Sequence, residues 1–174
     1  MLLREQLSRL YKSIGEQRSV LRALDVGTGA GENLRALLGA LPEATVLAID
    51  VDADALRSGL ATLPRGAEAK LEPVLADARA LPLRDGSFDL VASLAALHHL
   101  DDVERALVEA SRVLREGGYL VIAEWTPGSR LSPHPPDVAR RTLEEIRRAL
   151  PRLLRLADLR VFRDYILITA RKEH

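Results

Sequence analysis

The stretch Leu24-Asp25-Val26-Gly27-Thr28-Gly29-Ala30-Gly31 decides the fold class of this chain. It joins an apolar run at residues 21–26, which predicts a strand, to residues 31–40, whose pattern predicts a helix. Because glycine has no Cβ atom, the backbone here can turn tightly and a ligand can lie against it. The N-terminus of the following helix attracts negative charge. The stretch therefore predicts a ligand-binding loop between a strand and a helix of an α/β protein.

The spacing of the glycines separates the ligand classes that such a loop can serve. A dinucleotide site usually shows G-x-G-x-x-G, whereas the third glycine here, Gly31, comes one position early, and Glu32 stands where that pattern needs glycine. A phosphate-binding P-loop needs a lysine after its glycines, and Asn33-Leu34 offers none. Asp25, an acid directly before the loop, suits a ligand with an ammonium group better than one with phosphates. The spacing therefore disfavours both phosphate-bearing classes.

Short apolar runs alternate with amphipathic segments along the rest of the chain. Asp101 is predicted to cap a helix that runs to about Leu114 and ends at Gly117-Gly118. Apolar strands of this kind are covered on both faces, which predicts an open parallel sheet with its ligand beyond the carboxyl ends of the strands. The last two segments follow each other closely and predict an antiparallel pair at the sheet edge. Further strands are predicted at residues 46–50, 71–76, 88–94, 119–125, 159–163 and 165–171, and further helices at residues 2–18, 53–61 and 137–150.

The composition fits one domain and excludes several kinds of chemistry. Cysteine is absent, which excludes disulfides, thiolate metal sites and a cysteine nucleophile. Charged residues interrupt the leucines of the N-terminal segment, so neither a signal peptide nor a transmembrane helix is predicted there, and we expect a cytoplasmic protein. Arginine greatly outnumbers lysine, a bias that suits a thermophile and a GC-rich genome equally well.

The glycine loop resembles the first motif of class I S-adenosylmethionine-dependent methyltransferases of the generic small-molecule type, an acidic residue followed by G-x-G-x-G. In that family the loop passes beneath the methionine portion of the cofactor. The resemblance implies that Asp25, Gly27, Thr28, Gly29 and Gly31 belong to the cofactor site. It also implies a Rossmann-like α/β fold, with a mostly parallel seven-stranded sheet, one antiparallel strand near the C-terminus and helices on both faces. We expect one domain, 1–174, made of an N-terminal helix (1–18), a cofactor-binding core (20–125) and a substrate-side loop, helix and strand pair (126–174).

Later stretches resemble further motifs of the same family, in order and at ordinary spacing, over residues 20–125. By this resemblance Asp50, which closes the second predicted strand, accepts from both ribose hydroxyls, a task that suits the two oxygens of a carboxylate. Val51 would pack on the adenine, and Asp77 would accept from the adenine amino group. The resemblance also places Ala78, Ser93 and Leu94 at the cofactor. A similar α/β domain that uses its glycines only for a tight turn and its acids as helix caps is the alternative interpretation.

His98 and His99 follow the strand predicted at residues 88–94, where the acceptor and the methyl group should meet. An imidazole titrates near neutral pH, so either one is a candidate general base. The alternative is that one histidine packs beneath the loop and the other caps the helix at Asp101. His98, His99, Asp101 and Asp102 also suggest a metal site, but residues so close in sequence rarely form a full ligand set, and no metal is predicted. Trp125 either borders the acceptor or covers the core.

The acceptor is less constrained than the cofactor. Residues 130–174 carry 11 basic and 6 acidic side chains, and many of the arginines lie in the helix predicted at 137–150 and just beyond it. They would suit RNA, but Glu144 and Glu145 interleave them, and aromatic stacking residues are scarce. We therefore expect a small-molecule acceptor, with RNA as the alternative and no membrane partner. A non-catalytic subunit that only binds the cofactor is the alternative outside methyl transfer, and the oligomeric state is open.

Overall fold

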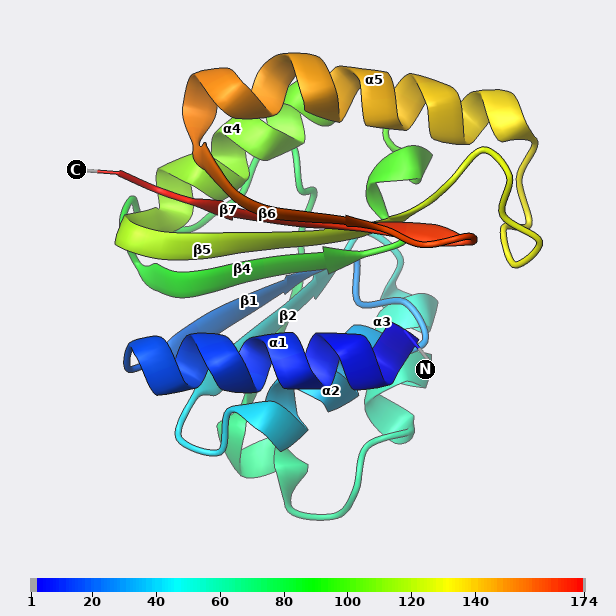
Figure 1. The fold of residues 1–174 in the computed structure, drawn as a ribbon. Coiled ribbons are helices and arrows are strands. Elements are labelled where there is room, and N and C mark those ends of the chain that lie inside the picture. The colour runs from blue at the N-terminus through cyan, green and yellow to red at the C-terminus, as the bar shows by residue number, and fades with distance from the viewer. Residues whose placement is uncertain (1–2, 174) are drawn as a thin grey trace.

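The structure, a computed structural model, describes residues 3–173, which form one seven-stranded sheet between two layers of helices (Figure 1). The strands are β1 (Arg22–Val26), β2 (Thr45–Asp50), β3 (Leu71–Leu75), β4 (Phe88–Leu94), β5 (Leu114–Trp125), β6 (Arg155–Val161) and β7 (Tyr165–Arg171). The helices are α1 (Leu3–Gln17), α2 (Glu32–Ala40), α3 (Ala53–Ala61), α4 (Val103–Val113) and α5 (Pro136–Leu153), with short 3₁₀ helices η1 (Ala67–Lys70) and η2 (Leu97–His99).

The strand order is β3-β2-β1-β4-β5-β7-β6. Neighbouring strands are parallel from β3 to β5, and β7 is antiparallel to both β5 and β6. The prediction of a mostly parallel sheet with one antiparallel strand near the C-terminus is confirmed. The chain moves outward from β1 to β2 and β3 and then crosses back to β4 on the other side of β1. Ligands of open α/β sheets bind at such a crossover, beyond the carboxyl ends of the strands.

Each face of the sheet has its own apolar core. Leu90 of β4 packs in the core beneath α1, α2 and α3, together with Leu37. The next residue, Val91, packs in the core beneath α4 and α5, together with Leu107. Because successive strand residues point to opposite faces, a strand covered on both sides is apolar throughout. This explains why β4 is an unbroken buried run in the sequence.

The boundaries of α4 differ from the prediction at both ends. Asp102, not Asp101, caps the helix, since its carboxylate accepts from the backbone N–H of Arg105 at 2.8 Å. The helix ends at Val113, and the chain enters β5 directly, because residue 114 already pairs with the first residue of β4. Gly117, with φ of 72°, therefore lies inside a strand, near the place where the β4–β5 register shifts, and does not end a helix.

The C-terminal elements are also longer or shifted. Helix α5 begins at Pro136, a favourable first position because a helix leaves its first N–H groups unpaired in any case. It continues through Pro151 to Leu153, which decides for the longer of the two ends that the sequence left open, at residue 150 or beyond Pro151. Strand β6 occupies Arg155–Val161 instead of 159–163, since its pairing with β7 extends from the first residue of β6. In residues 3–173 no helix combines the length and the apolar character that crossing a membrane requires.

Candidate active site

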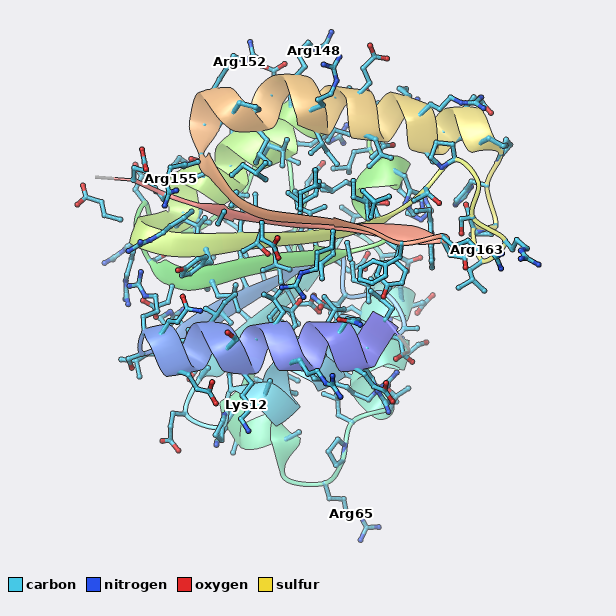
Figure 2. The ribbon with its side chains drawn as sticks, viewed as in Figure 1. Lys12, Arg65, Arg148, Arg152, Arg155 and Arg163 are labelled. Atoms are coloured by element: carbon cyan, nitrogen blue, oxygen red, sulfur yellow. The ribbon has the colours of Figure 1, made fainter. Side chains whose placement is uncertain are left out.

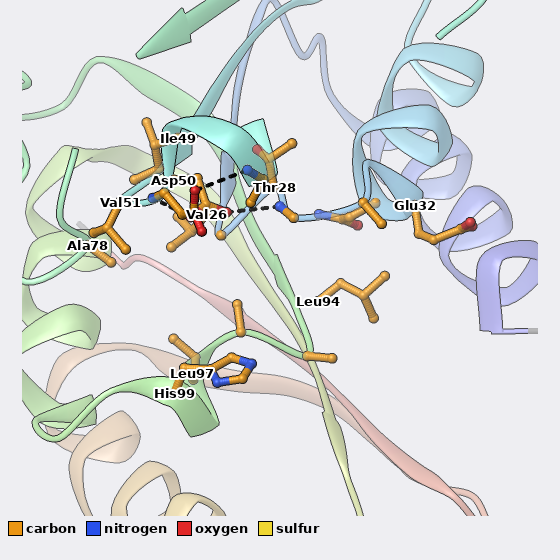
Figure 3. A pocket seen from close by; sticks show the side chains of 18 of the residues that line it. Val26, Thr28, Glu32, Ile49, Asp50, Val51, Ala78, Leu94, Leu97 and His99 are labelled. Atoms are coloured by element: carbon orange, nitrogen blue, oxygen red, sulfur yellow. Dashed lines mark hydrogen bonds between the residues drawn. The ribbon is translucent and has the colours of Figure 1, made fainter. Parts of the chain in front are cut away.

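A cavity of about 650 Å³ lies at the carboxyl ends of β1, β2 and β4, at the crossover of the sheet. This volume is within the usual range for small-molecule sites. Figure 3 shows the Asp50 and His99 side chains on opposite sides of it. The wall consists of the glycine loop, the end of β2 with the start of α3, Ala76 and Ala78 after β3, the segment from Leu94 to Leu97, His99, Leu100 and Trp125, and the first turn of α1.

The glycine loop is locked between β2 and β4. The backbone N–H groups of Gly27 and Thr28 both donate to the carbonyl of Ile49, at 2.9 and 3.0 Å. Gly27 has φ of +72°, and a Cβ atom there would lie 2.4 Å from the Cβ of Ala96. Only glycine fits this position without moving the chain that follows β4. The loop therefore presents bare backbone to the cavity.

Gly31 has a packing role behind that surface. Its φ is +80°, and a Cβ atom there would lie 2.7 Å from the carbonyl oxygen of Gly59 in α3. Gly31 does not line the cavity, although Gly27, Thr28 and Gly29 do. The third glycine thus lets α3 approach the loop, and the structure does not place it against a ligand.

Asp50 is the carboxylate that the loop itself holds at the cavity. Its Oδ2 accepts from the backbone N–H of Gly29 at 2.9 Å, and its Oδ1 accepts from that of Asp52 at 3.0 Å. Each oxygen keeps a lone pair for a ligand. The neighbouring acid, Asp52, instead caps α3 by accepting from the N–H groups of Asp54 and Ala55. Asp50 is therefore oriented to accept two hydrogen bonds from one ligand.

Asp25 lies beneath the loop and does not line the cavity, in contrast to the role that the sequence resemblance gave it. It is fully buried and accepts from Thr28 Oγ1 at 2.9 Å and from Asn33 Nδ2 at 2.7 Å. Tyr11 of α1 donates to Asn33 Oδ1 at 2.6 Å. Burial raises the pKa of Asp25 to about 6, against the opposing effect of the two hydrogen bonds. Its charge can reach a ligand only through the loop that it positions.

His98 and His99 differ in their surroundings. His98 is buried, and its Nδ1 lies 2.8 Å from Oε2 of Glu124, whose other oxygen accepts from the N–H of Leu97. His99 lines the cavity. Burial, followed by the neighbouring His98 and His134, lowers the pKa of His99, so its imidazole is neutral at pH 7. Neither histidine caps α4, and only His99 meets the cavity directly.

Residues 24–122, more than half of the chain, match the sequence pattern of a family described as a methyltransferase domain. The match takes in the glycine loop and Asp50 at the end of β2. The chain belongs to the class I S-adenosylmethionine-dependent methyltransferases. The family's cofactor is S-adenosylmethionine, and the match to its sequence pattern ends within β5.

This methyltransferase is similar to relatives of known name over only part of its own length and part of theirs. Malonyl-[acyl-carrier protein] O-methyltransferase of Geobacter sulfurreducens is 37% identical over 62% of this chain and 40% of its own. Demethylmenaquinone methyltransferase of Thermus thermophilus is 39% identical over 64% of this chain and 50% of its own. The chain thus spans about half or less of their length. A S-adenosylmethionine-dependent methyltransferase from Aquifex aeolicus has the same fold, with a TM-score of 0.75, 20% identity, and 98% and 99% of the two chains covered.

Of the residues that the resemblance places at the adenine, one does not line the cavity of this methyltransferase. Val51 and Ala78 line the cavity, and the Val51 side chain is 64% exposed there. Asp77 is outside the cavity wall, and both of its oxygens accept from the guanidinium of Arg79. This ion pair lowers the pKa of Asp77. Arg79 also bonds Asp101, which explains why that acid is not the cap of α4.

The end of β4 shows a second departure. Leu94 lines the cavity, as predicted, but Ser93 points away from it and is 4% exposed. The chain turns at Ala95, which has φ of +48° and is the one residue other than glycine with positive φ in the described range 3–173. Backbone strain of this kind concentrates at functional sites. The methyltransferase therefore brings backbone and small side chains, not the serine hydroxyl, to the cavity.

Arg4 and Trp125 line the cavity, although the sequence predicted no role for Arg4 and two alternative roles for Trp125. Arg4, in the first turn of α1, lines the cavity beside the glycine loop and is a cation available there to an anionic ligand group. Its position in sequence, twenty residues before the loop, gave no signal, because only the packing of α1 against α2 brings it there. Trp125 lines the cavity too, so it is placed to border a ligand there.

Proposed function

We propose that this chain transfers the methyl group of S-adenosylmethionine to a small-molecule acceptor, with residues 1–174 working as one domain. The observation that carries the proposal is the Asp50 carboxylate, held at the cavity by Gly29 with both oxygens available. A vicinal diol matches two acceptor oxygens on one group, and ribose supplies such a diol. The cofactor carries an electrophilic methyl group, so the protein has to align the acceptor and exclude water.

The remaining wall accounts for the other parts of the cofactor. The bare backbone of the glycine loop would lie under the methionine portion, and Arg4 would pair with its carboxylate. Val51 and Ala78 offer an apolar surface to the adenine. The methyl group would then point toward His99, which lies on the side opposite Asp50 (Figure 3). Trp125 also lines the cavity. We propose Asp50, Gly27, Gly29, Val51 and Ala78 as direct cofactor contacts, and Asp25 and Gly31 as residues that support them.

A small molecule fits this acceptor side better than RNA does. The relatives are named as methyltransferases of malonyl-[acyl-carrier protein] and of demethylmenaquinone, and the second of these is a small molecule. The arginines of α5 that favour RNA are on its outer face; Arg148 and Arg152 point away from the sheet (Figure 2). Arg152 also pairs with Glu104 at 2.7 Å. A site for RNA would need cations at the cavity, where Arg4 is the one arginine among the described residues.

Labelled S-adenosylmethionine distinguishes the outcomes. The purified chain is incubated with the labelled methyl donor and, separately, with small-molecule, RNA and protein fractions of the source cell. We expect label in the small-molecule fraction, and its loss with Asp50→Ala. Label in the RNA fraction, with a transfer rate that falls steeply as salt is added, would instead identify RNA as the acceptor. Cofactor binding without transfer to any fraction would support a non-catalytic subunit instead. A cytoplasmic location stays a prediction, which cell fractionation tests.

A further inference from the structure

Three histidines from two distant segments meet beside the cavity. His98 and His99 belong to η2, and His134 comes from the loop between β5 and α5. The ring centroids of His98 and His99 are 4.2 Å apart, and that of His134 lies 4.8 and 5.0 Å from them. One nitrogen of each ring lies within 4.8 Å of the others. Apart from His174, which is outside the described residues, these are all the histidines of the chain.

We propose that His98, His99 and His134 bind a divalent transition-metal ion, with Zn²⁺ as the fitting ion. Imidazole nitrogens suit Zn²⁺, whereas Mg²⁺ and Ca²⁺ prefer oxygen ligands. Zn–N bonds of 2.0–2.1 Å in tetrahedral geometry place the nitrogens about 3.4 Å apart. The nitrogens therefore close by roughly 1 Å or more on binding, which rotations of the imidazole rings supply.

Glu124 gives His98 the geometry of a metal ligand. Its Oε2 lies 2.8 Å from Nδ1 of His98, and it is itself fixed by the N–H of Leu97. The carboxylate accepts the Nδ1 proton, which fixes the tautomer and leaves Nε2 to bind the ion. Metal-binding histidines almost always donate their other N–H in this way. Glu124 is 2% exposed, so a buried negative charge also lies close to the proposed cation.

His134 supplies an independent observation that points to a ligand. Its Nε2 is buried and has no hydrogen-bond partner within residues 3–173. Leaving a buried ring nitrogen unpaired costs about 1–3 kcal/mol in proteins, so such an atom needs an explanation. A metal ion at the centre of the cluster would give it a partner.

The loop that carries His134 is built to hold it in place. Pro133 and Pro135 flank the histidine and restrict the backbone on both sides. Ser132 Oγ accepts from the N–H of His134, and Ser129 Oγ accepts from that of Ser132, both at 3.1 Å. Proline and serine thus restrain the backbone that carries His134, while its ring stays able to rotate, so little entropy is lost on binding.

The ion would have a coordination position for a further ligand. Three nitrogens fill three positions of tetrahedral Zn²⁺, and sites with three protein ligands keep the fourth for water or substrate. The cluster borders the cavity through His99. Under the proposed function, on which this step rests, a hydroxyl-bearing acceptor bound there would lose its proton to water more readily. Its oxygen would then bond the methyl carbon as the carbon–sulfur bond breaks, and His99 would act as a ligand in place of a general base.

Metal binding is tested on the whole chain without reference to methyl transfer. The protein is stripped with a chelator and dialysed against Zn²⁺ or, as a spectroscopic probe, Co²⁺. We expect one ion per chain and visible absorption of tetrahedral Co²⁺. His134→Gln and His99→Gln should each lose the bound ion, and Glu124→Gln should weaken binding roughly 10- to 100-fold. The control Asp102→Asn, at the residue whose carboxylate caps α4, should bind the ion like the wild type.

Affinity for S-adenosylhomocysteine is measured on the same samples. A variant that still binds this ligand is folded and has an intact cofactor site, whatever its metal content. Unchanged cofactor affinity in His134→Gln, with loss of the ion, supports the metal site. No ion above background in the stripped and reloaded wild type, or the same content in His134→Gln, overturns it. A protein that binds the ion but not S-adenosylhomocysteine would instead overturn the proposed function and leave the metal site standing.

Discussion

The backbone N–H of Gly29 donates to Oδ2 of Asp50 at 2.9 Å, a bond that ties the glycine loop to the end of β2. Asp50→Ala removes this bond and the two acceptors offered to the ribose. Hydrogen bonds to charged groups contribute about 1.5–3 kcal/mol each, so affinity for S-adenosylhomocysteine should fall by a factor on the order of 100 or more. Titration calorimetry measures it.

Asp52→Asn is the matched control for that variant. Asp52 also lines the cavity, but its side chain caps α3, and asparagine caps helices about as well as aspartate does. Its affinity for S-adenosylhomocysteine should stay within about twofold of the wild type, since a cap substitution of this kind changes little. An equal loss of affinity in both variants would mean that general negative charge, and not the Asp50 geometry, matters.

Gly27→Ala should both destabilise the chain and reduce cofactor binding. The new methyl group would meet the Cβ of Ala96 at 2.4 Å, at a backbone φ of +72°. We expect a loss of about 1–3 kcal/mol in the free energy of unfolding. Gly39→Ala in α2 meets no atom within 4 Å and should instead stabilise the helix by about 0.5–1 kcal/mol. Urea denaturation of both variants measures the difference, and equal effects would contradict the close approach at Ala96.

Asp25 should make stability depend on pH. Its pKa is raised from 3.8 to about 6 in the folded chain, so the folded state binds more protons than the unfolded state between these values. Its contribution to the free energy of unfolding is therefore fully present below pH 4 and decreases as pH rises through 6. The total decrease is about 3 kcal/mol.

Asp25→Asn isolates this contribution. Asparagine can accept from Asn33 and donate to Thr28, so the buried hydrogen bonds are kept without the charge. Denaturation curves at several pH values should show similar stability for the two proteins near pH 4 and a more stable variant at pH 8. A constant difference across the whole range would contradict the raised pKa.

Arg4 should contribute moderately to cofactor affinity through the methionine carboxylate. An exposed ion pair is worth about 0.5–1 kcal/mol, so Arg4→Gln should weaken binding of S-adenosylhomocysteine two- to fivefold. The effect should shrink at high salt. Arg9→Gln, in the same helix and away from the cavity wall, is the control. Binding of adenosine, which lacks the carboxylate, should be the same in wild type and Arg4→Gln, and a change there would assign Arg4 another role.

The parallel part of the sheet could be predicted from the sequence because each strand and helix in it has a recognisable residue pattern. Leu90 and Val91 are apolar because both faces of β4 are covered, and Asp50 ends its strand at the crossover. The segments after β4 gave weaker signals. Gly117 looks like a helix stop, but it lies in β5 because tertiary pairing with β4 begins before it.

Residues that act through tertiary contacts could not be predicted. Asp25 matches a motif by position, but burial among Thr28 and Asn33 turns it into a support for the loop. Asp77 is withdrawn from the cavity by Arg79, two positions away. His134 is separated from His98 and His99 by helix α4, strand β5 and a loop. The sequence places only two acids, Asp101 and Asp102, beside the histidine pair, whereas the structure groups three histidines.

Titration of S-adenosylhomocysteine into the purified chain tests the central claim most directly, with NAD⁺ as the comparison ligand. The glycine spacing and the acids Glu32, Asp50 and Asp52 at the cavity favour an adenosyl ligand without phosphates. We predict saturable binding of one S-adenosylhomocysteine per chain and none of NAD⁺. No binding of S-adenosylhomocysteine, or binding of NAD⁺ in its place, would contradict the assignment of the cavity.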